Sequence, residues 1–357
     1  MTNHATNARR AIATGLAILL ATSALVPAAH AEGELGLLVW EGYADQSFVK
    51  DFEAESGCKV QATYVGSNDD FVPKMQAGGG GVYDLLSVSA DASEVVIRSG
   101  FAEPIDTARI PEWNNIYESF RTVPSLNIDG QVWGVPFTWG ANPFIYRTDK
   151  IATPPTSIGD LWKPEFKGKV GMWDDKSMLY NAARLLGIAE PFKMTDEELE
   201  KAKNKLIEQK PLVRKYWTTA GELTQLMASD EVWISYTWGG LMLNEAKKLN
   251  LPVAEFMPKE GADGWVDNWM IVKDSPNQEC AYKYINFMMS PKGQCGVSTV
   301  TGYSASNPVA AKTCMSAEEF AAKHQDDVAY VKQLHMWQTP ERIEVYTNVW
   351  NAVKAAP

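Results

Sequence analysis

The stretch Asp263-Gly264-Trp265-Val266-Asp267-Asn268-Trp269 holds the side chains that are best suited to chemistry in this sequence. Carboxylates and an amide alternate with two tryptophans, and the apolar run Met270-Ile271-Val272 that follows predicts a strand. A carboxylate beside aromatic faces suits a cation with an apolar body, because the acid pairs with the charge and the rings contact the rest. The competing interpretation is a strand with a solvated Asp and two core tryptophans, which is the commoner role of an aromatic cluster.

Residues for catalysis or metal binding are scarce. Beyond the N-terminal segment the only histidines are His324 and His335, and no Cys-x-x-Cys spacing occurs. The remaining catalytic interpretation is an exported hydrolase with Asp175 and Asp267 as acid and base, which no nucleophile motif supports. We therefore expect no enzyme, no cofactor and no metal site.

The N-terminus has the pattern of a secretory signal peptide. Arg9 and Arg10 precede the apolar run 11–26, which is too short to be a stable membrane span. Ala29-His30-Ala31 matches the small-x-small cleavage pattern, so we expect residues 1–31 to be removed and the mature chain to begin at Glu32. The alternative is an uncleaved membrane anchor.

Charge and length narrow the class of protein further. The formal charge of −11 becomes −13 without Arg9 and Arg10, and an acidic exported chain does not suit binding to a phosphate backbone. We therefore expect no nucleic-acid partner. A net negative field favours a cationic solute, although solubility alone explains it as well. The mature chain of about 326 residues is long enough for two lobes.

Four cysteines remain in the mature chain, and an even number in an oxidising compartment predicts disulfides. Cys280 begins a predicted helix that ends before Ser290-Pro291, which leaves Cys295 too far along that path to pair with it. We predict Cys280–Cys314, with Cys58–Cys295 as the less certain second pair.

The chain alternates predicted strands and helices, which is typical of an α/β fold with parallel strands. A first unit begins with a strand at 35–39, and a second begins after the apolar segment 132–146. The chain is expected to leave the first lobe near Thr138 and to return near Asp267, which makes a hinge and a cleft. The expected segments are 1–31 (signal peptide), 32–138 (first part of the N-terminal lobe), 139–265 (C-terminal lobe), 266–310 (return to the N-terminal lobe) and 311–357 (C-terminal helices closing onto the lobes).

Several side chains directly follow predicted strands. In open α/β sheets ligands bind at the carboxyl ends of the strands, so these residues mark the expected site. They are Trp40, Ser89, Trp139, Asp175, Trp238 and Tyr303.

A series of short motifs resembles the periplasmic solute-binding proteins of spermidine/putrescine-type ABC transporters over nearly all of the mature chain. The motifs, in order, are Trp40-Glu41-Gly42-Tyr43, Tyr83-Asp84-Leu85, Pro136-Phe137-Thr138-Trp139-Gly140, the segment 160–168, Trp238-Gly239-Gly240, Pro258-Lys259-Glu260-Gly261, Trp265-Val266-Asp267, Gly302-Tyr303-Ser304-Ala305-Ser306-Asn307 and Trp337-Gln338. Each is weak alone, but all of them in order indicate that family. The resemblance implies a two-lobed, type II periplasmic-binding-protein architecture.

The resemblance also implies roles for matching residues. Asp267 would pair with an ammonium group, Ser89 and Gln338 would add hydrogen bonds, and Asp175 would be a second acid at the far end. The methylene chain would be enclosed by Trp40, Tyr43, Trp238, Trp265 and Tyr303.

The sequence departs from the family pattern at the second-amine end. Met178 and Leu241 stand where diamine binders tend to have a carboxylate, and Asp91 replaces an aromatic residue. Position 42 is Gly where an acid is common, with Glu41 beside it. Arg214 is either a surface residue at a strand end or a fork for a ligand carboxylate. In the second case a zwitterion such as 4-aminobutyrate would fit better than a diamine.

The resulting hypothesis is a periplasmic binding module that captures a small amine-bearing solute by closing two lobes over it. Its implied partners are the permease and ATPase of an ABC importer, and we expect a monomer. The chain could instead serve a chemoreceptor. The predicted ligand-binding set is Trp40, Glu41, Tyr43, Ser89, Asp91, Trp139, Asp175, Arg214, Trp238, Trp265, Asp267, Tyr303 and Gln338.

Overall fold

The computed structural model describes residues 33–325 and 327–357. The predicted signal peptide and its cleavage site lie outside these residues. No helix in the described part of the chain is long and apolar enough to cross a membrane.

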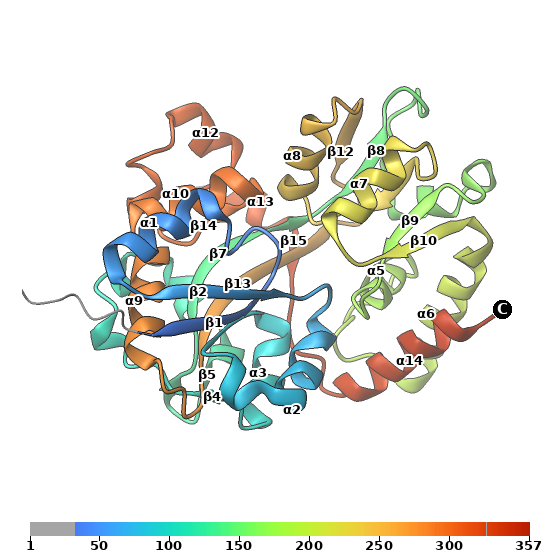
Figure 1. Ribbon diagram of the computed structural model, residues 1–357. Coiled ribbons are helices and arrows are strands. Elements are labelled where there is room, and N and C mark those ends of the chain that lie inside the picture. The colour runs from blue at the N-terminus through green and yellow to red at the C-terminus, as the bar shows by residue number, and fades with distance from the viewer. Residues whose placement is uncertain (1–32, 326) are drawn as a thin grey trace, which may run out of the picture. The chain divides into compact units, whose positions relative to one another are not determined.

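Two β-sheets organise the described chain (Figure 1). The first has eight strands, in the order β14-β7-β13-β3-β1-β2, with β15 and β4 also paired to β13. Its strands are β1 (Glu34–Val39), β2 (Lys59–Tyr64), β3 (Leu85–Ser89), β4 (Ala102–Glu103), β7 (Val135–Asn142), β13 (Ala262–Val272), β14 (Ser304–Ala305) and β15 (Leu334–Met336). We call this sheet and the helices on it the first lobe.

The second sheet has five strands, in the order β10-β9-β11-β8-β12. They are β8 (Phe144–Arg147), β9 (Val170–Trp173), β10 (Val213–Trp217), β11 (Ile234–Tyr236) and β12 (Val253–Phe256). We call this sheet and its helices the second lobe. A separate hairpin pairs β5 (Asn127–Ile128) with β6 (Gln131–Val132).

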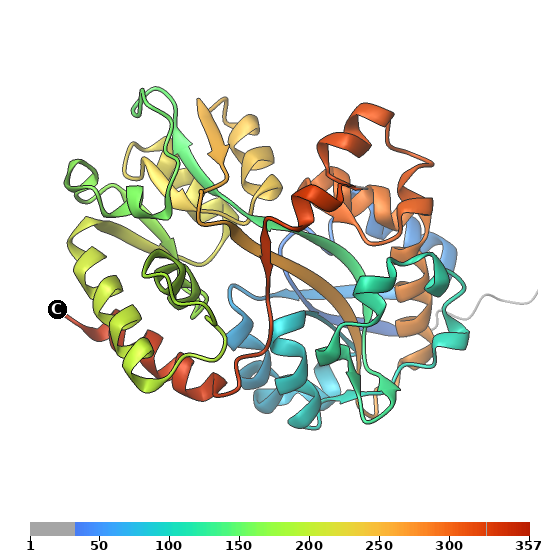
Figure 2. The same ribbon diagram turned by 180° about the vertical axis from the view of Figure 1, so that it is seen from behind.

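Helices cover both sheets. Those of the first lobe are α1 (Gln46–Ser56), α2 (Phe71–Val82), α3 (Ala90–Arg98), α4 (Glu118–Arg121), α9 (Gln278–Met289), α10 (Pro291–Thr301), α11 (Pro308–Ala311), α12 (Ala317–Ala322) and α13 (Val328–Val331). Those of the second lobe are α5 (Met178–Leu185), α6 (Asp196–Gln209), α7 (Ala220–Ala228), α8 (Gly240–Lys248) and α14 (Ile343–Ala355). The C-terminal helix α14 lies beside α6 (Figures 1 and 2). The expected α/β architecture with two lobes is confirmed.

Local sequence explains where the helices begin and end. Asp45 caps α1 by accepting a hydrogen bond from the Ser47 backbone N–H, and Gly57 ends the helix with φ of 77°. Thr195 and Glu198 form a reciprocal capping box at the start of α6. These contacts satisfy backbone groups that a helix end would otherwise leave unpaired.

Strand β13 connects the two lobes. It runs antiparallel to β7 and β3 (Figure 2), and by solvent exposure all of its residues are buried. Because both faces of the strand are covered, its apolar residues do not alternate strictly with polar ones. Gly140 of β7 lies opposite Trp265, and a Cβ at Gly140 would stand 2.7 Å from the indole ring. The glycine therefore makes room for a tryptophan in the middle of the sheet.

The chain passes between the lobes three times. It crosses at Pro143 between β7 and β8, returns between β12 and β13, and crosses again between β15 and α14. The first two passages were expected near Thr138 and Asp267, and both of these residues lie inside strands of the first sheet.

The predicted disulfide connectivity is wrong. The bonds are Cys58–Cys280 and Cys295–Cys314, with Cα–Cα distances of 5.9 and 6.2 Å. Cys58 directly precedes β2 and meets the first turn of α9, whereas Cys295 of α10 meets the residues after α11. Spacing along the chain excluded Cys280–Cys295 but carries no information on which elements pack side by side.

Both disulfides are expected to stabilise the protein, and by different amounts. In the chain-entropy model the Cys58–Cys280 loop of 222 residues predicts about 5 kcal/mol, and the Cys295–Cys314 loop of 19 residues predicts about 3 kcal/mol. Two double variants, each with both cysteines of one disulfide replaced by Ser, are unfolded in urea to measure this difference. A larger loss for the Cys295/Cys314 variant would contradict the loop-length argument.

Candidate functional site

A pocket is lined by residues from both lobes, and its empty volume of about 350 Å³ includes space open to solvent. The lining consists mainly of aromatic residues, together with two acids, one serine and one asparagine. The residues are Trp40, Glu41, Tyr43, Ser89, Asn142, Trp173, Trp238, Trp265, Asp267, Tyr303 and Trp337.

The carboxyl ends of strands bring most of these side chains together. Trp40 follows β1, Ser89 ends β3, Trp173 ends β9 and Trp238 comes two residues after β11. Parallel strands in one sheet end at the same edge, so short segments far apart in the sequence converge there. The expectation that the site lies at this edge agrees with the position of the pocket.

Asp267 is the most deeply held acid of the pocket. Its position on β13 is opposite Ser89 on β3, and the Ser89 hydroxyl donates to Asp267 Oδ1 at 2.5 Å. The Tyr43 hydroxyl donates to Asp267 Oδ2 at 2.6 Å. The residue is 4% exposed and has no cationic partner among these contacts.

This environment changes the acidity of Asp267. Burial raises the pKa of the carboxyl to about 7, although the hydrogen bonds from Ser89 and Tyr43 favour the charged form. Burial and the neighbouring Asp267 also raise the pKa values of Tyr43 and Tyr303. The two hydroxyl groups therefore stay protonated, and that of Tyr43 remains a donor to the acid.

Aromatic rings from both lobes surround the carboxyl. Trp265 and Tyr303 meet edge to face at 4.7 Å between ring centroids. Trp40 of the first lobe lies 5.9 Å from Trp238 and 6.1 Å from Trp173 of the second lobe. Ring faces and edges at such distances form an apolar wall that can also contact a cation.

Glu41 provides the second acid of the pocket. Its Oε2 accepts a hydrogen bond from the Ala220 backbone N–H at 2.7 Å, at the N-terminus of α7 in the other lobe. Burial raises the pKa of Glu41, and the hydrogen bond from Ala220 opposes this. The N-terminus of a helix favours a negative charge, so the contact also joins the two lobes electrostatically.

The structure brings most of the predicted site residues to the pocket and leaves five outside its lining. Those in the lining are Trp40, Glu41, Tyr43, Ser89, Trp238, Trp265, Asp267 and Tyr303. Trp139 is buried, and its indole N–H donates to the Ala305 carbonyl. Gln338 lines a separate groove that also contacts Trp337.

Arg214 does not face the pocket. Its guanidinium is half exposed and pairs with Glu231, also on the surface of the second lobe. The strand β10 lies at the edge of the second sheet, and the burial pattern of its residues shows Arg214 on the solvent side. Of the two interpretations of Arg214, the structure agrees with the surface residue, and its place in the predicted ligand-binding set is corrected.

Three lining residues were not predicted as site residues, although Trp337 stands in one of the motifs that carry the family resemblance. Trp173 lies inside β9, and Trp337 follows β15, which is too short to be recognised by pattern. Asn142 ends β7, and its Oδ1 accepts a hydrogen bond from the Trp265 indole at 2.9 Å. The only sequence signal for Trp173 was its place before Asp174 and Asp175 at the end of a predicted strand.

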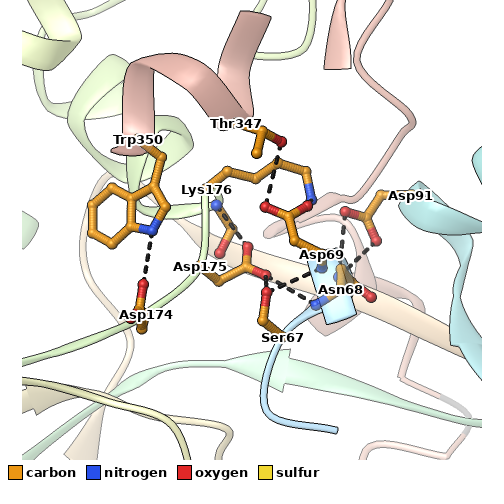
Figure 3. Close-up of polar contacts among 10 residues, drawn as sticks. Ser67, Asn68, Asp69, Asp91, Asp174, Asp175, Lys176, Thr347 and Trp350 are labelled. Carbon is orange, nitrogen blue, oxygen red and sulfur yellow. Dashed lines mark hydrogen bonds and ion pairs between the residues drawn. The ribbon is translucent and has the colours of Figure 1, made fainter. Parts of the chain in front are cut away.

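Asp175 and Asp91 belong to a polar cluster next to the pocket (Figure 3). Asp175 Oδ2 accepts hydrogen bonds from the Ser67 hydroxyl at 3.0 Å and from the Asn68 N–H at 3.1 Å. Lys176 is fully buried and pairs with Asp69 at 2.8 Å. The Asn68 amide donates to Asp91 at 3.2 Å. Residues 67–69 belong to the first lobe, so the cluster joins the lobes.

The described residues hold no group of three or more His, Cys, Asp or Glu side chains placed to bind a metal ion.

Comparison with known proteins identifies the class. Residues 47–328 match the family model described as bacterial extracellular solute-binding protein, so the chain belongs to that family. The chain is 28% identical over 334 residues to the spermidine/putrescine-binding periplasmic protein 1 of Haemophilus influenzae. This alignment covers 92% of this chain and 91% of that protein. It is 29% identical over 309 residues to the spermidine/putrescine-binding periplasmic protein of Escherichia coli. This alignment covers 84% of this chain and 86% of that protein.

Solved structures confirm the fold. The spermidine/putrescine ABC transporter substrate-binding protein PotD from Streptococcus pneumoniae superposes with a TM-score of 0.70 at 24% identity, over 90% of this chain and 98% of that one. The expected two-lobed type II periplasmic-binding-protein architecture is thereby confirmed.

Replacement of Asp267 by Asn is expected to stabilise the ligand-free protein, and more so at high pH. The pKa of Asp267 is about 7 in the folded protein and near 4 in the unfolded chain. The unfolded state therefore releases its proton first, and the wild-type protein loses stability as pH rises from about 4 to about 7. The neutral amide has no such dependence. The gain in unfolding free energy should be about 2–3 kcal/mol larger at pH 8 than at pH 5.

Urea unfolding of both proteins at the two pH values measures this difference. The matched control is Glu94→Gln, which removes a partly exposed acid on α3 in the same lobe and should show no comparable change. An equal effect of Asp267→Asn at pH 5 and pH 8 would contradict the assigned acidity.

Proposed function

We propose that this protein is the periplasmic solute-binding component of an ABC importer and captures a putrescine/spermidine-type amine between its lobes. The observation that carries the proposal is the charge of the pocket. Its lining, within the described residues, contains the carboxylates of Asp267 and Glu41 and no Lys, Arg or His. A buried carboxylate is costly without a counter-charge, so the pocket favours a cation.

The remaining lining suits the body of such a ligand. Trp40, Trp238 and Trp265 present apolar ring surface beside the acids. An alkyl chain gains from contact with the rings, and an ammonium group near a ring face gains about 0.5–2 kcal/mol. A linear amine combines both features in one molecule.

The 4-aminobutyrate alternative has less support. Its amine would pair with Asp267, but its carboxylate would lie in a pocket that already holds Glu41. Arg214, the expected partner for that carboxylate, pairs with Glu231 at the surface. Repulsion between the ligand carboxylate and Glu41 would disfavour the zwitterion relative to a diamine.

The relatives and the N-terminal sequence support the proposed location and partners of the protein. The relatives from H. influenzae and E. coli are named periplasmic, which supports export through the signal sequence at 1–31. Delivery to a permease driven by an ATPase, action as a monomer and absence of catalysis are part of the same proposal. Closure would be a population shift, because only the closed form lets a ligand contact both lobes.

Calorimetric titration of the mature, ligand-stripped protein tests the ligand class. We expect putrescine to bind, and Asp267→Ala and Glu41→Gln each to weaken it at least ~30-fold, since each removes a partner of a buried charge. Arg214→Ala is the matched control and should leave affinity unchanged. Binding of 4-aminobutyrate alone would show that the ligand is a zwitterion. The absence of binding heat with every amine would contradict the proposal.

Affinity should also depend on pH in a defined direction. An ammonium ligand needs the ionised form of Asp267, whose pKa in the free protein is about 7. Association should therefore weaken as pH falls below about 7, approaching roughly tenfold per unit, and level off between about pH 7.5 and 9. Titrations with putrescine from pH 5 to 9 measure this, and a flat profile from 5 to 7 would contradict it.

A further inference from the structure

The acids next to the pocket form a second possible position for a cation. Asp91 comes two residues after the pocket-lining Ser89, and Asp175 comes two residues after the pocket-lining Trp173. Burial, and after it the charges of Asp175 and Asp267, raise the pKa of Asp91 to about 8, although Lys176 opposes this. The cluster and the pocket are thus within electrostatic range of each other.

This second position already contains a cation from the chain. The ammonium group of Lys176 lies 2.8 Å from Asp69 Oδ1, and the lysine is fully buried (Figure 3). Burial disfavours the charged lysine, but Asp69, Asp175 and Asp91 outweigh this and raise its pKa. Lys176 is therefore charged at neutral pH.

The acids of the cluster already have partners within the protein. Asp175 accepts hydrogen bonds from Ser67, Asn68 and the Ser177 backbone N–H. Asp69 accepts from Lys176 and from Thr347 of α14. On the side of the pocket, Trp40 packs against Trp173 and Phe71, at 6.1 and 5.9 Å between ring centroids.

We propose that Lys176 is a built-in counter-cation that limits the charge of the ligand. It occupies the cation position of the Asp69–Asp91–Asp175 cluster, so only Asp267 and Glu41 remain to pair with ligand ammonium groups. The pocket then favours a linear diamine over a triamine, because a third ammonium would have no partner and would be repelled by Lys176. This inference rests on the proposed function and specifies its substrate class.

The test compares three linear amines of increasing charge: 1-aminobutane, putrescine and spermidine. Their affinities for the mature, ligand-stripped protein are measured by calorimetric titration at pH 7.5 and constant ionic strength. For the wild type we expect putrescine to bind more tightly than either of the other two.

Lys176→Met should make affinity rise more steeply with ligand charge. Each additional ligand charge should gain on the order of tenfold relative to the wild type, so the ratio of spermidine to putrescine affinity increases. Asp69→Asn removes a negative partner of Lys176. It should therefore lower the ratio of putrescine affinity to 1-aminobutane affinity. Asp69 is partly exposed, so this variant decides the question if the lysine variant does not fold.

Lys167→Met is the matched control for net charge. Lys167 is exposed and precedes β9, at the end of the strand opposite to Asp175. The role of Lys176 would be overturned if Lys176→Met changed the charge dependence no more than Lys167→Met, or if Asp69→Asn left it unchanged. A wild type that prefers spermidine would also overturn it. A wild type that binds no amine would instead overturn the proposed function.

Discussion

The pocket depends on the burial of one carboxylate, that of Asp267. Its two oxygens accept hydrogen bonds from hydroxyl groups on different segments, Ser89 on β3 and Tyr43 after β1. The register of β13 is therefore strongly constrained, since a slip by one residue would turn Asp267 to the other face and bring Val266 or Asn268 toward the hydroxyls. The same register places Trp265 over Gly140, where a larger residue would collide with the ring. One strand thus determines the position of both the acid and an aromatic wall.

Closure of the lobes decides how strongly that acid acts. Trp173 and Trp238 from the second lobe complete a wall that begins with Trp40, and Glu41 reaches the N-terminus of α7. With water excluded, charges in the pocket interact more strongly than they would in solution. Separation of the lobes to admit a solute, which the proposed function requires, would also break the contacts of Asp175 with Ser67 and Asn68. Binding energy and lobe closure are consequently coupled.

The sequence predicted the two lobes and most of the pocket, for a physical reason. Strand ends are marked by short apolar runs, and side chains just beyond them, such as Ser89 and Trp238, converge because parallel strands share an edge. Asn142 and Trp337 escaped prediction because their places depend on partners far along the chain, Trp265 and the pairing of β15 with β13. The disulfides failed for the same reason. Arg214 was misplaced because a two-residue periodicity does not tell which face of an edge strand meets solvent.

The proposed charge selection depends on which acids already have a partner within the protein. The family resemblance implied that Asp175 is a second acid for an amine, and its place after a predicted strand marked it as part of the expected site. The structure separates Asp175 from Asp267: Asp267 is held only by hydroxyl groups, whereas Asp175 receives two N–H groups and a hydroxyl beside the ammonium of Lys176. A hydroxyl stabilises a carboxylate without neutralising it, so Asp267 still gains from a ligand cation. Asp175 has the ammonium group of Lys176 beside it, so a ligand cation would add little stabilisation there. The number of acids near a cleft is therefore a poor guide to the charge of its ligand, and the neighbours of each acid are the better one.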